Sequence, residues 1–194
     1  MQVDVASWLS RVTRATVTGA TATVTVTGPD GTAREVSEHH LRADDLLHWS
    51  YTVRSDGQET HQSCNGREMT HIVGGNRLRS QVPTGPASVD DPWYFYSWPG
   101  AVEGWLVEMV RPVDLLARVV VSSVDTRGTR GTVRIRATPL GNEPSPYSGF
   151  SVPDGRSLRL SLDTERGCFT DVTVTHPGET GQTHHLVYRL TTFE

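Results

Sequence analysis

The feature that most limits the fold is a repeated alternation of apolar and polar residues. Valines and threonines alternate from Thr16 to Thr27, and leucines alternate with polar residues from Leu158 to Leu162. β-Branched residues pack well on a pleated sheet and poorly in a helix. Because successive side chains of a strand point to opposite faces, the alternation predicts strands that bury one face and expose the other.

Turn signals separate these alternating stretches. Between residues 16 and 83 they recur roughly every eight to ten residues, a spacing typical of short antiparallel strands joined by hairpins. They are Gly28-Pro29-Asp30-Gly31, Asp56-Gly57, Asn65-Gly66 and Gly74-Gly75. We count about nine to ten strands. The predicted fold class is mainly β (α+β), either a strongly curved antiparallel sheet or an unclosed β-barrel.

Helical periodicity is confined to two stretches. Residues 5–14 carry apolar side chains at i, i+3, i+4 and i+7, and residues 100–117 carry one apolar stripe that Pro112 interrupts. Residues 83–99 are predicted to form an aromatic, proline-bearing loop. Two or three short helices are too few to cover both faces of such a sheet, so we expect them to cover its concave face.

Composition sets the remaining limits. The chain has 194 residues, of which 36% are apolar, and a formal charge of −4. This content supports one core, and we expect a single half-barrel domain over residues 1–194. No apolar run is long enough to span a bilayer, and the acidic balance argues against nucleic acid as a partner.

All 18 basic residues are arginine. Guanidinium groups recognise phosphates and carboxylates, but such recognition needs a clustered patch. The arginines are scattered along the chain, which favours codon bias in a GC-rich genome as their explanation.

The two cysteines, Cys64 and Cys168, are too few for the disulfide framework of a small secreted domain. The first ten residues lack the basic and apolar regions of a signal peptide. We therefore expect reduced thiols and a cytoplasmic location.

Several short motifs resemble a known family. They are Asn65-Gly66 in the central hairpin, the segment Arg111 to Leu116, the segment Gly131 to Pro139, and the segment Leu160 to Gly167. Together with the order of elements, they resemble the LolA-like/LppX-like superfamily, and in particular small LolA-related proteins of high-GC bacteria. The resemblance covers roughly residues 5–190, although Thr70 stands where the family tends to place tryptophan. It implies an unclosed barrel that shelters a lipid or lipoprotein in an apolar cavity.

An aromatic cluster is the candidate ligand site. Aromatic side chains offer large contact areas at low entropic cost, so this cluster is a candidate mouth for a hydrophobic small molecule or an acyl chain. The alternative is that the same residues fill the core. The candidate residues are Trp93, Tyr94, Tyr96, Trp98, Trp105 and Met109.

The sequence gives weaker support for metal binding, for catalysis and for binding of a protein partner. Adjacent histidines in a strand point to opposite faces and do not chelate together, so we expect neither a metal nor a cofactor. The adjacent carboxylates at Asp44-Asp45 are interpreted as solvated turn residues. The alternative function is a small barrel enzyme of the cyclase or isomerase type, acting on a hydrophobic natural product with an acid–base pair from His71 and Asp90 or Glu103. A protein partner bound through an open sheet edge is a third possibility.

Overall fold

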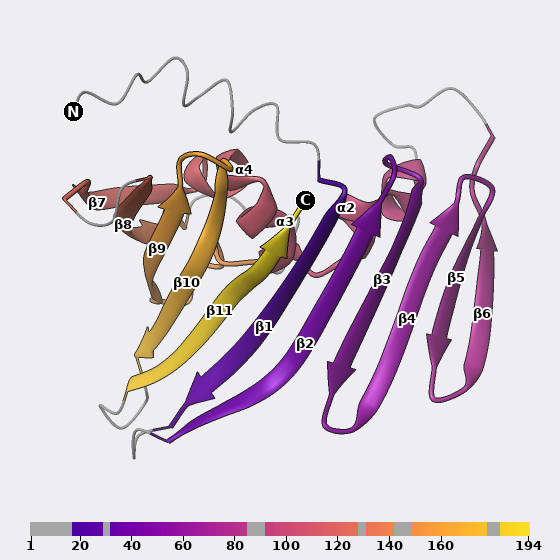
Figure 1. Cartoon of the computed structure of the whole chain (residues 1–194), viewed down its shortest axis with the longest axis horizontal. Coiled ribbons are helices and arrows are strands. Elements are labelled where there is room, and N and C mark those ends of the chain that lie inside the picture. Colours follow the sequence, from indigo (N-terminus) through magenta and orange to yellow (C-terminus); the bar gives the residue numbers. More distant parts are fainter. Residues whose placement is uncertain (1–16, 29–31, 85–91, 128–130, 142–148, 178–182) are drawn as a thin grey trace.

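The computed structural model describes residues 17–28, 32–84, 92–127, 131–141, 149–177 and 183–194. Eleven strands form one antiparallel sheet, in the spatial order β6-β5-β4-β3-β2-β1-β11-β10-β9-β8-β7 (Figure 1). The strands are β1 (Gly19–Thr27), β2 (Ala33–Ala43), β3 (His48–Ser55), β4 (Gln58–Asn65), β5 (Glu68–Val73), β6 (Asn76–Gln81), β7 (Val119–Asp125), β8 (Thr132–Pro139), β9 (Ser157–Asp163), β10 (Cys168–Pro177) and β11 (Thr183–Phe193).

The sheet is open, as predicted, because β6 and β7 each pair on one side only within the described residues. The first and last strands lie side by side in its middle, where Val24 of β1 faces Tyr188 of β11. The mainly β class and the curved antiparallel sheet are confirmed. The expected count of nine to ten strands is too low, since the sheet has eleven; β5 and β6, at one edge, are only six residues long.

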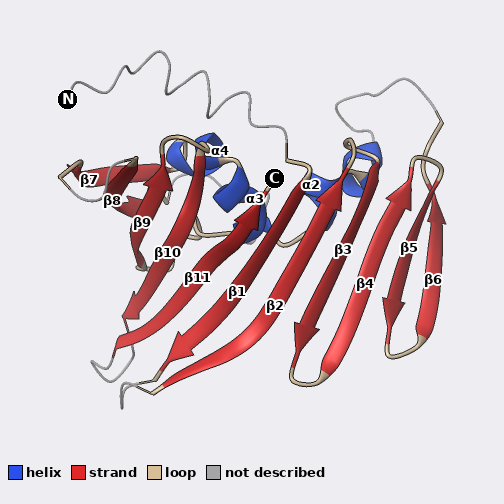
Figure 2. Cartoon of the chain, viewed as in Figure 1, coloured by secondary structure: helices blue, strands red, loops and turns tan. Residues whose placement is uncertain are grey.

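Short helices lie on one side of this sheet (Figure 2). They are the 3-10 helix η1 (Pro92–Tyr96), α2 (Trp98–Ala101), α3 (Gly104–Val110) and α4 (Pro112–Leu116). The expected helix over 100–117 is broken, because Val102 is extended and Pro112 begins a new helix after Arg111. The expected loop over 83–99 is wrong in its last part, since residues 92–96 and 98–99 are helical. The predicted helix over 5–14 lies outside the described residues.

The core lies between these helices and the face of the sheet that they cover, from β3 through β1 and β11 to β8. Leu158, Leu160 and Leu162 of β9 are buried, as are Leu106 and Met109 of α3. Full burial of a leucine contributes about 2–3 kcal/mol relative to exposure. The alternation seen in the sequence therefore places one face of β9 beneath the helical layer.

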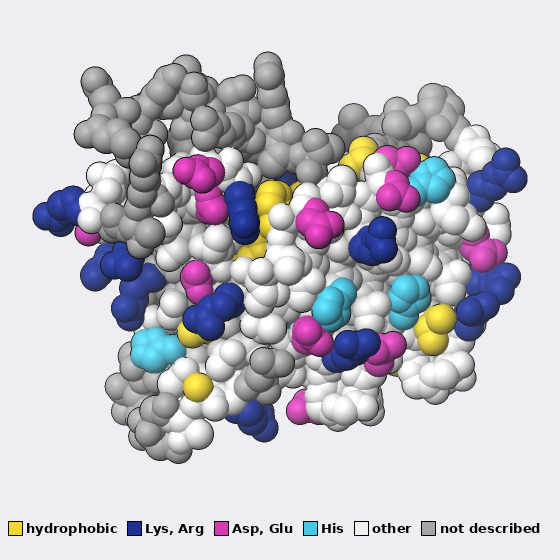
Figure 3. All heavy atoms as spheres, in the orientation of Figure 1, with side chains coloured by type: hydrophobic (Ala, Val, Ile, Leu, Met, Phe, Trp, Pro, Cys, Tyr) yellow, Lys and Arg dark blue, Asp and Glu magenta, His cyan; other side chains and the backbone are white. Residues whose placement is uncertain are grey.

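The opposite face of the sheet is polar (Figure 3). Cross-strand pairs of threonine and histidine recur on it, with Oγ1–Nδ1 distances of 3.3 Å for Thr21–His40, 3.1 Å for Thr52–His61 and 3.0 Å for Thr175–His185. Such directly opposed pairs stabilise neighbouring strands. Among the helices that the structure describes, none is long and apolar enough to cross a membrane.

The two cysteines are buried and unpaired. Cys64 lies on β4 and Cys168 on β10, five strand positions apart, which is roughly 24 Å along the sheet. A disulfide requires Cα atoms within about 7 Å, so this fold does not permit a bridge between them in any compartment. Burial raises the pKa of both thiols, that of Cys168 to about 12, so neither is an activated nucleophile.

Candidate functional site

An apolar pocket opens between α4 and the strands at the β7 edge. Its volume is about 320 Å³, and the surface that it exposes is wholly apolar. Ligand pockets commonly measure about 300–1,000 Å³, so this one is large enough for a short apolar chain. It is lined by Leu116, Val121, Val124, Thr126, Val133, Ile135, Leu162 and Thr164.

The position of this pocket follows from the edge of the sheet. α4 ends at Leu116, so β7 and β8 extend past the helix that covers their neighbours. Val121 and Val124 consequently remain 42% and 58% exposed. Val120, on the opposite side of the same strand, is exposed as well and does not line the pocket. Contiguous exposed apolar surface of this kind marks binding sites more often than isolated apolar residues do.

The predicted aromatic site residues occupy a different place. Tyr94 and Tyr96 belong to η1 and are half-buried. Trp98 of α2 and Trp105 and Met109 of α3 are buried in the core. The side chain of Trp93 lies outside the described residues. None of the described five lines the apolar pocket.

Trp98 corrects one premise of that prediction. Its side chain is only 6% exposed, and its backbone N–H donates to the carbonyl of Leu46 at 3.0 Å. The helix therefore fixes this residue against the loop between β2 and β3. Because the tryptophan begins a helix over the sheet, it contributes to core packing, whereas a loop tryptophan would be free to face a ligand.

A buried polar cluster lies beneath α3. His39 is 4% exposed, and its Nδ1 and Nε2 lie 2.7 Å from the hydroxyls of Tyr51 and Ser37. Trp105 packs edge-on against the imidazole, with ring centroids 4.7 Å apart. Burial lowers the pKa of His39 to about 4 and, with Glu103 nearby, raises the pKa of Tyr51. The cluster holds β2, β3 and α3 together, and a substrate does not reach an imidazole so deeply buried.

A buried carboxylate anchors the other end of α3. Glu108 accepts hydrogen bonds from the Phe150 N–H at 2.5 Å and the Ser151 hydroxyl at 3.1 Å. Burial raises the pKa of this glutamate. A Cβ at Gly149 would lie 2.3 Å from Glu108 Oε2, so only glycine allows the close approach. The segment that precedes β9 is thus tied to α3 through Phe150 and Ser151.

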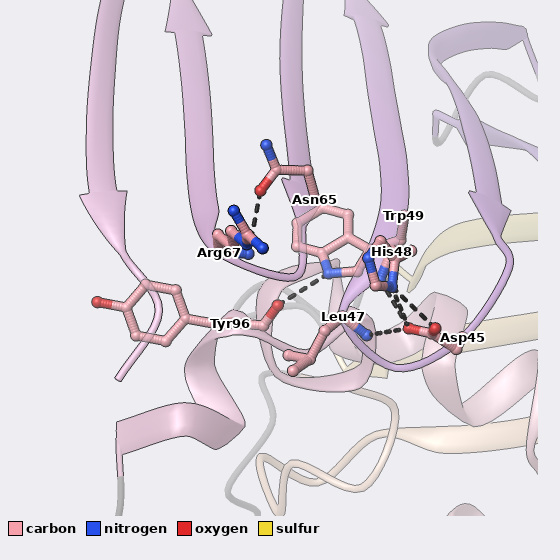
Figure 4. A network of polar contacts seen from close by, with 7 residues as sticks. All are labelled: Asp45, Leu47, His48, Trp49, Asn65, Arg67 and Tyr96. Atoms are coloured by element: carbon pink, nitrogen blue, oxygen red, sulfur yellow. Dashed lines mark hydrogen bonds and ion pairs between the residues drawn. The ribbon is translucent and has the colours of Figure 1, made fainter. Parts of the chain in front are cut away.

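A polar network borders the ends of β2 to β5 (Figure 4). Asp45 accepts from the N–H groups of Leu47 and His48 at 2.8 Å, which confirms its interpretation as a turn residue. His48 Nδ1 lies 2.8 Å from Asp45 Oδ2, and Trp49 Nε1 donates to the Tyr96 carbonyl at 2.8 Å. Gly66 lies under the imidazole, because a Cβ there would come within 2.7 Å of His48 Nε2.

Among the described residues, no hydrogen bond or ion pair joins His71 to Glu103, the two described candidates for acid–base catalysis. His71 lies on β5 with Nε2 3.5 Å from Gln62 Nε2, while Glu103 precedes α3 and has a pKa raised by burial. Asp90 lies outside the described residues. Over the described part of the chain, no group of three or more His, Cys, Asp or Glu side chains has a geometry that holds a metal ion.

Comparisons with known proteins give matches to solved structures. The chain is similar to a LolA superfamily protein from Nitrosomonas europaea, with 7% identity, a TM-score of 0.36, and coverage of 100% of this chain and 94% of that one. It is also similar to LprF from Mycobacterium bovis, with 11% identity, a TM-score of 0.42, and coverage of 96% and 89%. A third match is the MucA/MucB complex of Pseudomonas aeruginosa, with 17% identity and a TM-score of 0.33, covering 99% of this chain and 57% of that one.

The matched structures include a protein of the LolA superfamily, the superfamily that the sequence motifs resemble. No family model and no curated protein matches the chain.

Proposed function

We propose that this protein is a non-catalytic binding protein that holds an apolar chain, from a lipid-like molecule or an acylated partner. The pocket between α4 and β7 to β9 is the observation that carries the proposal. Its exposed surface is wholly apolar, and it opens at the β7 edge of the sheet, with which no further described strand pairs. Burying a methylene there contributes about 0.8 kcal/mol, so a chain of several carbons binds without any polar contact.

The two adjacent valines of β7 provide a matched test. Val121 lines the pocket, whereas Val120 points to the other face, and both are substantially exposed. We expect Val121→Asn to weaken binding of an uncharged apolar fluorescent probe, N-phenyl-1-naphthylamine, at least tenfold. Val120→Asn should change it less than twofold, because that side chain does not touch the pocket. Equal effects of the two variants, or an absence of saturable binding by the parent, would contradict the proposal.

The predicted aromatic residues around Tyr96 are a second candidate site for the same apolar ligand. Tyr96 is half-buried, and only its backbone carbonyl bonds Trp49, so Tyr96→Ala leaves that hydrogen bond in place. If Tyr96→Ala abolishes probe binding and Val121→Asn does not, the ligand binds beside Tyr96 and not in the pocket next to α4. Native mass spectrometry of the purified protein then identifies any ligand that remains bound.

We also propose a cytoplasmic location. Because the fold keeps Cys64 and Cys168 too far apart to pair, the state of the thiols does not test this proposal. Cell fractionation followed by detection of the native protein does, and recovery in the envelope fraction would contradict it.

A further inference from the structure

Three arginines gather on the polar face of β8 and β9, opposite to the apolar pocket. Arg136 and Arg159 face each other directly in the β8–β9 register, and Arg134 faces Ser161 two residues away. All three side chains are exposed, and Figure 3 shows dark blue side chains gathered over these strands at the left of the view. Directly opposed residues have Cβ atoms about 5 Å apart, so both guanidinium groups reach one common point.

The acidic side chains near these three arginines form ion pairs with other arginines. Asp171 accepts from Arg189 Nε at 3.0 Å, and Asp125, which faces Arg134 in the β7–β8 register, pairs with Arg127 at 3.1 Å. No ion pair within the described part of the chain includes Arg136 or Arg159. Like charges directly opposed across two strands destabilise a sheet, so this pair favours binding of an anion.

The surface is hollowed at the same place. A depression of about 320 Å³ is bordered by the three arginines, by the hydroxyl residues Ser161 and Thr173, and by Asp171, which pairs with Arg189. Guanidinium groups donate planar pairs of hydrogen bonds that match phosphate oxygens, and hydroxyls add further donors. The three guanidinium groups and two hydroxyls together offer more hydrogen-bond donors than a single carboxylate ligand accepts, which favours a phosphate group.

We propose that this depression over β8 to β10 is a binding site for a phosphate group. It lies on the other face of the strands that line the apolar pocket, and it rests on different observations from the proposed function. The arginines are scattered along the chain but not in the fold, because Arg136 and Arg159 are distant in sequence and adjacent in the sheet.

Calorimetric titration with inorganic phosphate, at constant ionic strength set with sodium chloride, tests the site. We expect saturable binding that Arg136→Gln and Arg159→Gln each weaken at least tenfold. Arg77→Gln removes the same charge from an exposed position on β6 and should change the affinity less than twofold. Arg136→Lys retains the charge but not the planar fork, so it should recover only part of the affinity.

Either of two results would contradict the proposed phosphate site. One is an absence of saturable phosphate binding, and the other is an equal loss of phosphate affinity in all four variants, including Arg77→Gln. Circular dichroism of each variant establishes that it is folded. Two further ligands distinguish the source of the phosphate. Loss of binding to phosphatidic acid vesicles in Arg136→Gln, with phosphatidylcholine vesicles as the blank, supports the site as one for a lipid headgroup. Saturable binding of glycerol phosphate without vesicle binding supports it as one for a soluble phosphate ester.

Discussion

The helix-facing side of the sheet differs between its two ends. Leu158, Leu160 and Leu162 of β9 are buried beneath the helical layer, whereas every residue of β6 is exposed and Leu78 is 67% exposed. Both strands are regular and antiparallel, and each belongs to a hairpin. Strand formation therefore does not itself create a core. The apolar face of a strand becomes core only where a second layer covers it.

The largest expected effect concerns Trp98, which lies where the helical layer reaches the strands of the β6 end. Because Trp98 and Trp105 are both buried, we expect either tryptophan-to-alanine variant to lose about 3–5 kcal/mol of unfolding free energy. Urea denaturation followed by far-UV circular dichroism measures this loss. A Trp98→Ala variant within about 1 kcal/mol of the parent would instead support the prediction that this residue faces a ligand.

A second expected effect is a dependence of stability on pH, which arises from His39 in the buried polar cluster beneath α3. Its folded pKa of about 4 lies below the ordinary value of 6.5, so the unfolded chain takes up the proton first. The neutral, buried imidazole therefore contributes to the unfolding free energy in full above pH 6.5. This contribution, about 3 kcal/mol, is lost as the pH falls toward 4. The measurement is the unfolding free energy of the parent and His39→Gln between pH 7 and pH 4.

The difference between those two pH profiles isolates His39 from the other titrating groups. We expect the gap between parent and His39→Gln to narrow by about 3 kcal/mol as the pH falls. Tyr51→Phe should retain most of the parental pH dependence, because burial is the leading cause of the lowered pKa. A constant gap from pH 7 to pH 4 would show that His39 is more accessible to water than its burial indicates.

The smallest effect is expected at the uncovered end. Leu78→Ala on β6 should change the unfolding free energy by less than about 0.5 kcal/mol, because its side chain already lies in solvent. Leu160→Ala, the matched change on β9, should cost about 2–5 kcal/mol. Comparable losses in the two variants would show that a further layer covers β6 in solution.

The aromatic candidates and the valines of β7 show what a local pattern leaves open. Trp105 and Met109 form an apolar stripe, but a stripe has the same pattern whether it faces a core or a cavity. The valines of β7 predict only a strand, and nothing in their pattern indicates the apolar pocket. Its exposure depends on where α4 ends relative to the edge of the sheet.

Local sequence patterns specify the individual strands and turns of this protein. Alternation and turn chemistry specify an antiparallel sheet because they act over a few residues, through side-chain direction and the backbone freedom of glycines such as Gly66. Which faces are covered, and which distant residues meet, depends on the tertiary packing. Arg136 meets Arg159, and His39 meets Trp105, through strand register and helix placement. Those features arise from contacts between residues far apart in the chain, where no local pattern records them.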